Sequence, residues 1–166
     1  MCVGPSLIEL KQSRHQCSGM AVQIRAYRDD DWAAWLRLSL ALFHEHSAHE
    51  LEPGMRDHRA RSDAEVFLAE REDGSVAGFV EVGARPYADG CDTSPVGYIE
   101  AWYVDPDARR KGYGRALLAA AENWARSRGY REIASDAQLN NEISYEAHRK
   151  AGYAEVDRII QFRKAL

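Results

Sequence analysis

The stretch Val96–Gly114, which reads VGYIEAWYVDPDARRKGYG, decides the fold because it joins an apolar run to a basic glycine turn. Its first nine residues, Val96–Val104, are nearly all apolar or aromatic, which is typical of a central strand buried on both faces. The turn Arg109–Gly114 follows, and an alanine- and leucine-rich segment of helical spacing begins near Arg115. Together these features predict an anion-binding loop at the N-terminus of a helix.

The chemistry of this turn supports the prediction. The first turn of a helix presents backbone N–H groups without intrahelical partners and carries partial positive charge. Gly112 and Gly114 have no Cβ, so the main chain can approach a ligand closely. Arg109, Arg110 and Lys111 supply positive charge for a diphosphate. The spacing fits neither G-x-x-x-x-G-K-[ST] nor G-x-G-x-x-G, and a basic glycine turn alone is also compatible with a solvated helix start.

The turn reads [QR]-x-x-G-x-[GA], which resembles the pyrophosphate-binding loop of the GNAT-type N-acetyltransferases. The resemblance implies an α/β (α+β) fold whose mixed central sheet is flanked by helices and splays at the acetyl-CoA site. It implies acetyl-CoA as cosubstrate, with the pyrophosphate on the glycine turn and the pantetheine arm along the strand. The implied coenzyme contacts are Trp102, Val104, Arg109, Arg110, Lys111, Gly112, Tyr113, Gly114, Asn141, Tyr145 and His148.

Four stretches in the second half of the chain resemble the aminoglycoside 6'-N-acetyltransferases of the chromosomal, dimeric type. They are YADGCDTSP at Tyr87–Pro95, EIASD at Glu132–Asp136, NEIS at Asn141–Ser144 and GYAEVDRIIQFRK at Gly152–Lys164. The resemblance implies acetylation of the 6'-amine of an antibiotic such as kanamycin or tobramycin, which confers resistance. It also implies a homodimer.

Two carboxylates, Glu100 and Asp136, occupy positions that favour a functional site. Glu100 lies inside the apolar strand, where an ionised carboxylate must be paired or line a cavity. The strand period of two places its side chain on the side of Tyr98, Trp102 and Val104. Asp136 ends its strand at the carboxyl edge, where open α/β sheets usually bind ligands. An ion pair with an arginine would also explain Glu100, and a helix cap or turn would explain Asp136.

The resemblance gives these carboxylates roles in catalysis and substrate binding. It implies that both contact the amines of the aminoglycoside, and that Asp136 or a water it holds lies near the reacting 6'-amine. It further implies that Phe43, Tyr87 and Asp157 line the same acidic pocket, with Asp157 reaching it across a dimer. Phe43 fits a core position on the first helix equally well.

An acidic pocket favours amines as substrates for a chemical reason. An alkyl amine with a pKa near 10 is mostly protonated at neutral pH, and only roughly one part in a thousand is the free base. A carboxylate can bind the ammonium group and accept its proton, directly or through water. Two unit charges 4 Å apart gain roughly 4 kcal/mol at an effective dielectric constant of 20. We therefore expect direct transfer to a polycationic amine in a ternary complex, without a metal.

One position departs from the pattern of many GNAT-type enzymes. These enzymes carry a tyrosine four residues before the terminal G-[FY] pair, where it protonates the leaving thiolate. Counted back from Gly152, this position is His148, and Tyr145 lies one turn earlier on the same helix face. We expect His148 to contact the coenzyme rather than to act as the acid, because a thiolate is already a good leaving group.

The remaining pattern predicts one domain. Besides Val96–Val104, strands are expected at 22–27, 66–70, 76–83, 132–136 and 156–164, with a hairpin turn at Asp73-Gly74. Helices are expected after Asp29–Asp31, after the glycine turn and at 141–151. The histidine-rich stretch 44–61 lacks the H-E-x-x-H spacing, so a flexible acidic lid is expected there rather than a metal site.

Composition limits the class of protein. The chain has 166 residues, 45% of them hydrophobic and 29% charged, which suits a single globular domain at residues 20–166. Residues 1–19 are expected to be a disordered or artificially added tail. Cys2, Cys17 and Cys91 form no C-x-x-C pair, which favours a reducing cytoplasm. A net charge of -4 argues against nucleic acid as partner, and no stretch predicts a membrane partner.

Other functions remain compatible with these features. A polyamine, or a protein or peptide amine, is the alternative acceptor for a GNAT enzyme of this kind. A degenerate acyltransferase fold would bind acyl-CoA without turnover. The loop G-C-D-T-S-P favours the antibiotic, and the presence of Glu100 and Asp136 favours catalysis.

Overall fold

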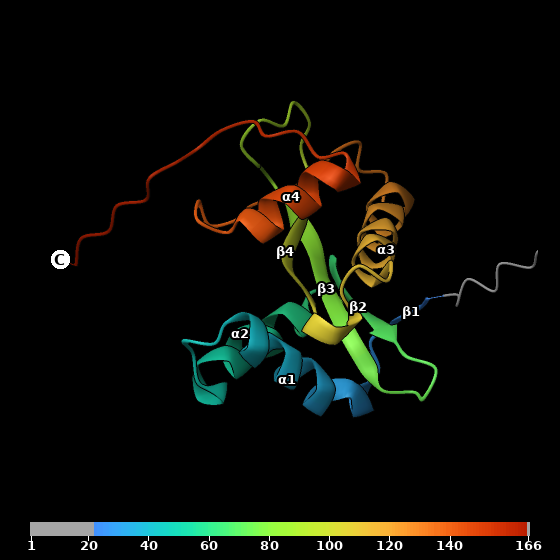
Figure 1. The fold of residues 1–166 in the computed structure, drawn as a ribbon. Coiled ribbons are helices and arrows are strands. Elements are labelled where there is room, and N and C mark those ends of the chain that lie inside the picture. The colour runs from blue at the N-terminus through green and yellow to red at the C-terminus, as the bar shows by residue number, and fades with distance from the viewer. Residues whose placement is uncertain (1–21, 166) are drawn as a thin grey trace, which may run out of the picture.

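The computed structural model describes residues 22–165, and the predicted tail 1–19 lies outside these residues. Five strands form one sheet in the order of the chain: β1 (Gln23–Ala26), β2 (Ala64–Glu70), β3 (Val76–Arg85), β4 (Val96–Val104) and β5 (Ile133–Ser135). Strands β1 to β4 pair antiparallel, whereas β5 pairs parallel to β4. This mixed sheet confirms the predicted fold class (Figure 1).

Helices cover both faces of the sheet. They are α1 (Trp32–Leu42), α2 (Ala48–Ala60), α3 (Tyr113–Ser127) and α4 (Glu142–Ala151), with short 3-10 turns at Asp29–Asp31 and Pro106–Ala108. Figure 1 shows α1 and α2 together on one side, away from α3. The alternation of β3 explains the two layers, because Val80 packs in the core under α3 whereas Phe79 packs with Trp35 of α1. Each face of the sheet therefore has its own hydrophobic core.

A bulge in β4 changes which residues share a face. Val82 pairs with Ile99 and Glu81 with Ala101, so Glu100 is an extra residue in the β4 strand. Trp102 and Val104 pack with α3, but Glu100 borders a cavity lined by α1 and α2. The prediction that Glu100 shares the side of Trp102 and Val104 is therefore wrong, because the bulge breaks the strand period of two.

Helix α2 replaces the predicted acidic lid. Ser47 and Glu50 form a capping box, in which the Glu50 carboxylate accepts from the Ser47 backbone N–H at 2.8 Å. Met55 and His58 of this helix are buried against the sheet. The stretch is an ordered helix because its cap and its two inward side chains fix it. The S-x-x-E spacing was the signal in the sequence that could have identified it.

The strand predicted at 156–164 is also wrong. After Gly152 the chain continues without helix or strand and leaves the body of the protein (Figure 1). Ile159, Ile160 and Phe162 are 53%, 76% and 92% exposed. A strand forms only where a neighbouring edge accepts its backbone hydrogen bonds, and this segment has no such neighbour among the residues described. The apolar alternation that predicted a strand is present, but its partner is not.

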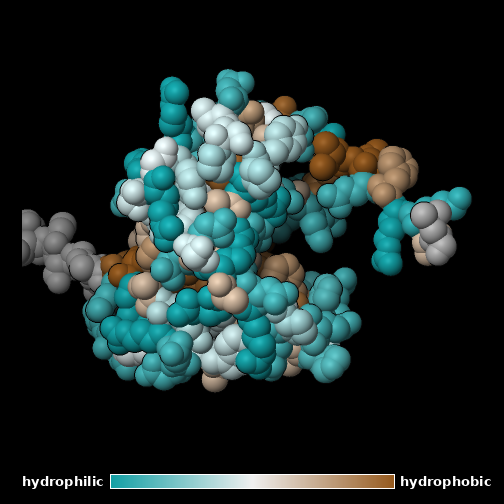
Figure 2. All heavy atoms as spheres, turned by 180° about the vertical axis from the view of Figure 1, so that it is seen from behind, coloured by the Kyte–Doolittle hydropathy of each residue, from teal (hydrophilic) through white to brown (hydrophobic). Residues whose placement is uncertain are grey.

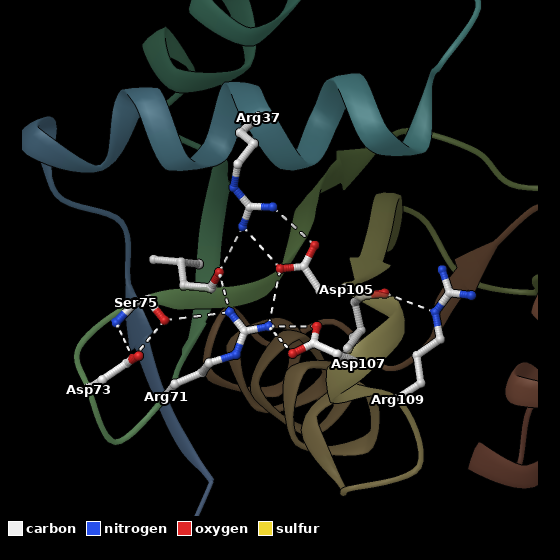
Figure 3. A network of polar contacts seen from close by, with 9 residues as sticks. Arg37, Arg71, Asp73, Ser75, Asp105, Asp107 and Arg109 are labelled. Carbon is white, nitrogen blue, oxygen red and sulfur yellow. Dashed lines mark hydrogen bonds and ion pairs between the residues drawn. The ribbon is translucent and has the colours of Figure 1, made fainter.

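Asp105 ties together the elements that precede the glycine turn (Figure 3). Its carboxylate, 9% exposed, accepts two hydrogen bonds of 3.1 Å from Arg37 of α1 and one of 3.3 Å from Arg71. Arg37 also donates to the Val76 carbonyl, and Arg71 donates to Asp107 at 2.9 Å. Because Asp105 directly follows β4, this network fixes the start of the connection that leads to α3.

Asp105→Ala is expected to lower the free energy of unfolding by about 2–4 kcal/mol, because it leaves two arginines without their shared carboxylate. Chemical denaturation measures this loss. The matched control is Asp107→Ala, since the Asp107 side chain is 73% exposed and its pair with Arg71 should contribute less than about 1 kcal/mol. Equal losses in the two variants would contradict a structural role for the buried network.

Candidate active site

The sheet opens between β4 and β5. The two strands pair only at Gly97, Tyr98 and Ile99, opposite Ile133–Ser135. The part of β4 from Ala101 to Val104 pairs with β3 on one edge and has no β5 partner on the other. Its backbone groups on that edge are therefore available to a ligand. This opening is the splay expected of the predicted fold.

The glycine turn lies at the end of this opening. Arg110 and Gly112 have positive φ angles of 60° and 93°, and α3 begins at the next residue. The first helical hydrogen bond described for this end runs from Ala116 N–H to the Gly112 carbonyl at 3.0 Å. The N–H groups before Ala116 in α3 are thus free of i→i−4 partners and point out of the helix end. The geometry fits an anion such as a diphosphate.

Some side chains of the turn are exposed to solvent, whereas others already bind or pack against the protein itself. Arg110 and Lys111 are exposed and available. The Arg109 Nε donates to the Val104 carbonyl at 3.0 Å, so this arginine also supports the loop itself. Tyr113 is 9% exposed and packs in the core under α3. Any contact of Tyr113 with a coenzyme must therefore come from its backbone.

Gly114 and Trp102 pack closely behind the turn. A Cβ on Gly114 would lie 2.8 Å from Cζ2 of Trp102, which is closer than two carbon atoms can approach. The Trp102 ring also meets the ring of His148 edge to face, with the centroids 5.4 Å apart. Trp102 therefore connects the start of α3 to α4. Its indole N–H is buried and has no partner among the residues described.

His148 connects α4 to the end of β5. Its Nδ1 lies 2.8 Å from the Ser144 carbonyl, which can only accept, so in the neutral form of the ring Nδ1 carries the proton. Its Nε2 lies 3.1 Å from Ser135 Oγ and then accepts from that hydroxyl. Asn141 caps the same helix, since its side-chain oxygen accepts from Ser144 N–H at 3.0 Å. Tyr145 is 41% exposed on this helix.

A cavity of about 520 Å³ lies between the sheet and helices α1 and α2. Glu100 of β4 and Phe43, which follows α1 and is 38% exposed, both line it. The predicted residues Tyr87, Asp136 and Asp157 are not among its lining residues. The wall is completed by Ser39, His46, Glu50, Leu51, Gly54, Met55, Asp57, His58, Arg61 and Glu81.

Glu100 forms an ion pair, as one of the two interpretations of the sequence expected. Arg85 donates to it from Nη2 and, at 3.1 Å, from Nε, and Arg61 Nη1 lies 3.9 Å away. The Arg85 guanidinium stacks on the Tyr98 ring at 3.4 Å from its centroid. Burial and the charge of Asp136 raise the pKa of Tyr98 to about 12. The negative charges of Asp136 and Glu100 thus both raise the pKa values of Arg85 and Tyr98.

The loop that carries Tyr87 is held by a residue that the sequence analysis did not identify. The Glu132 carboxylate accepts from the backbone N–H groups of Asp92 at 3.0 Å and Thr93 at 2.7 Å. These bonds lower the pKa of Glu132, after the larger effect of the Thr93 hydroxyl. Tyr87 is 65% exposed at the surface of this loop, and Asp157 is also exposed. Glu132 therefore fixes the G-C-D-T-S-P loop to the start of β5.

A second missed residue, Glu81, lines the cavity beside Glu100. Its Oε1 accepts from the Trp35 indole N–H at 2.9 Å. Burial raises the pKa of Glu81 from 4.5 to about 7, the Trp35 hydrogen bond opposes this rise, and the charge of Glu100 adds to it. Glu81 therefore keeps its proton to a higher pH than an ordinary glutamate.

The raised pKa of Glu81 predicts how stability depends on pH. Between about pH 4.5 and 7 the folded chain holds a proton on Glu81 that the unfolded chain releases, so this contribution to stability is lost as the pH rises. Glu81→Gln cannot ionise, and it should be more stable than the wild type by up to about 3 kcal/mol near pH 8. The advantage should vanish near pH 4. Thermal unfolding across this range measures it, and a difference that does not change with pH would contradict the assignment.

Between residues 22 and 165, no three His, Cys, Asp or Glu side chains are grouped so that they could hold a metal ion. Over the same range, no helix has the length and apolar character needed to cross a membrane.

The opened sheet and the glycine turn at the start of α3 are the features of an acyltransferase. The chain belongs to the acetyltransferase (GNAT) family, whose sequence pattern matches residues 19–153. It is similar to the aminoglycoside N(6')-acetyltransferase type 1 of Klebsiella aerogenes, with 40% identity over 146 residues, which are 86% of this chain and 96% of that protein. The enzyme of the same name from Stenotrophomonas maltophilia is 40% identical over 149 residues, covering 88% and 95% of the two chains.

Solved structures agree with these relatives. The aminoglycoside 6'-N-acetyltransferase AAC(6')-Ih from Acinetobacter baumannii matches with a TM-score of 0.80 and 30% identity, over 88% of this chain and 99% of that one. AAC(6')-Iy, in complex with the bisubstrate analogue CoA-S-monomethyl-acetylneamine, matches with a TM-score of 0.82 and 30% identity over the same shares. The resemblance inferred from the sequence is therefore confirmed.

Proposed function

We propose that this protein transfers the acetyl group of acetyl-CoA to the 6'-amino group of aminoglycosides and thereby confers resistance. The observation that carries the proposal is that the coenzyme-type opening of β4 and an acidic cavity share one strand, with Glu100 at the bulge between them. The names of the relatives support the substrate, and the bisubstrate complex of AAC(6')-Iy supports both substrates in one site. We assign the reaction to the cytoplasm.

The residues of the opening are proposed to hold the coenzyme. Its diphosphate would bind the free N–H groups at the start of α3, near the exposed side chains of Arg110 and Lys111. The coenzyme supplies an activated thioester when it is bound. The contacts proposed around it remain Trp102, Val104, Arg109, Gly112, Tyr113, Gly114, Asn141, Tyr145 and His148.

The carboxylates are proposed to prepare the acceptor amine. Asp136 follows β5 at the opening, where it can bind an ammonium group and accept its proton, directly or through water. Glu100, held by Arg85, orients the amine from the other strand. Phe43, Tyr87 and Asp157 complete the acceptor site in this proposal. No covalent enzyme intermediate is required.

Release of coenzyme A thiol from acetyl-CoA tests the function. Purified protein should turn over kanamycin and tobramycin, but not an analogue with a 6'-hydroxyl group, because only an amine forms the amide. Turnover restricted to spermidine or a lysine peptide would keep the enzyme class and overturn the antibiotic. Absence of turnover, with coenzyme binding retained, would favour a non-catalytic acyl-CoA-binding protein.

The C-terminal segment supports a homodimer. In Figure 2 this segment carries a group of hydrophobic atoms that stand out from the body of the protein. In an extended strand, Val156, Ile160 and Phe162 would lie on one face, and all three are more than half exposed in the single chain. Apolar surface of this kind marks an interface. We propose that the segment packs against a second copy of the chain.

Ile160→Asp combined with Phe162→Asp should therefore convert the dimer to a monomer, because two charges would have to be buried in the interface. Sedimentation velocity measures the change. Gln161→Asp, a polar position between them, is the control and should leave the dimer intact. A wild-type protein that sediments as a monomer would overturn the dimer.

A further inference from the structure

We propose that Glu81 is a second anionic anchor in the cavity, which binds an ammonium group of the polycationic acceptor other than the group that reacts. This inference rests on the proposed function for the identity of the reaction. The binding site itself rests on the geometry of β3, β4 and the two helices that cover them.

Glu81 and Glu100 lie next to each other at the β4 bulge. Glu81 pairs with Ala101 across the sheet, directly beside the extra residue Glu100. Both carboxylates line the cavity between the sheet and helices α1 and α2. Ile99 packs in the core under α3, so the alternation of the strand turns Glu100 to the other face, where Glu81 also lies. The bulge sets Ala101 opposite Glu81, so the two acids are neighbours on adjacent strands without being directly opposed.

The two carboxylates differ in what compensates their charge. Glu100 has Arg85 in a two-fold hydrogen-bonded pair and Arg61 Nη1 at 3.9 Å. Glu81 has one hydrogen bond, 2.9 Å from the Trp35 indole, which is neutral. No ion pair of Glu81 is present among the residues that the structure describes. An ionised carboxylate that is buried without an ion pair is unfavourable, and a nearby cation would remove this cost.

Burial and the neighbouring Glu100 both raise the pKa of Glu81, to about 7. No cation of the protein counteracts them. An ammonium group close to Glu81 would reverse this effect, because the opposite charge favours the ionised form. Glu81 is therefore poised to become an anion when a cationic ligand enters the cavity.

The walls of the cavity favour a small polyamine as the ligand. Its volume of about 520 Å³ falls in the range of roughly 300–1,000 Å³ that is typical of small-molecule sites. Glu50 and Asp57 of α2 add acidic groups to those of the sheet, and Arg61 is the one arginine in the wall. Leu51 and Met55 provide apolar surface between the acids. A molecule with several ammonium groups on an apolar frame matches this pattern.

Glu81→Gln tests the inference, because the amide oxygen can still accept from Trp35 while the charge is removed. Calorimetry near pH 8 should show that kanamycin and spermidine bind at least about tenfold more weakly to this variant. The affinity for acetyl-CoA should not change. In turnover, KM for kanamycin should rise while kcat stays within about twofold, because the contact is not made to the reacting amine.

Two further variants separate this role from others. Glu52→Gln removes the same charge from α2 outside the cavity wall and should leave amine binding unchanged. Glu81→Asp keeps the charge and should retain part of the affinity, which a merely structural role would not explain. It also provides the comparison if Glu81→Gln folds poorly.

The outcomes distinguish this inference from the proposed reaction. Unchanged affinity of Glu81→Gln for both amines would overturn the anchor, even if the wild type acetylates kanamycin. A fall in kcat with KM unchanged would also overturn it, since Glu81 would then act on the reacting group. Weaker amine binding by the variant, with a wild type that does not acetylate kanamycin, would support the anchor and refute the antibiotic as substrate.

Discussion

Gly112→Val is expected to abolish coenzyme binding, with at least about a hundredfold loss of affinity for coenzyme A in calorimetry. Gly112 precedes α3 with a φ of 93°, a conformation that a β-branched residue avoids. A Cβ at this position would clash with no atom of the protein, since its nearest neighbour is Val22 Cγ2 at 3.7 Å. The loss therefore comes from the changed course of the backbone and from a side chain that occupies the space of the ligand.

A second glycine provides the control for strain alone. Gly74 in the β2–β3 turn also has a positive φ, 81°, and open space around a Cβ. Gly74→Val should cost a similar roughly 1–3 kcal/mol of stability, but it should leave coenzyme affinity unchanged because the turn is not part of the proposed site. Equal coenzyme affinity in Gly112→Val and the wild type would mean that the turn does not bind the diphosphate.

Local patterns predicted much of the fold. The strand Val96–Val104, the glycine turn and the helix after it follow from periodicity and the positions of glycine, and the structure confirms all three. The hairpin around Gly74 and the end of the helix at Gly152 were also predicted from the positions of these glycines. In the structure both glycines have positive φ angles, which glycine adopts readily. Each of these signals depends on residues within one or two turns of chain.

Features that depend on distant partners could not be predicted in this way. The bulge at Glu100 is a shift in the register between β3 and β4, and no local sequence pattern predicts the extra residue. From the sequence, Glu81 would be taken for an ordinary exposed residue of a strand. Only the fold shows that Trp35, which is distant in sequence, donates a hydrogen bond to it. The stretch 156–164 has the alternation of a strand, but pairing also requires an edge to pair with. The geometry of the glycine turn could thus be predicted from local sequence, whereas the cavity between the sheet and helices α1 and α2 could not.

Asp136→Asn is expected to lower kcat/KM for kanamycin by at least about tenfold while the affinity for acetyl-CoA stays the same. The amide has almost the same shape as the carboxylate, but it can neither pair with an ammonium group nor accept its proton. Glu142→Gln, which removes an exposed charge from the start of α4, should have little effect and controls for the general field of the protein. An unchanged kcat/KM in Asp136→Asn would remove this residue from the site.

The pH profile of Asp136→Asn separates proton acceptance from simple attraction. If Asp136 accepts the proton of the amine, the defect of the variant should shrink as the pH rises toward about 9, because more of the amine is then already the free base. If the carboxylate only attracts the ammonium group, the defect should lie mainly in KM and kcat should be equal in the two proteins at saturating amine. A kcat defect that stays constant from about pH 6 to 9 would contradict the proposed role, since proton acceptance by the carboxylate must matter most where the amine is protonated.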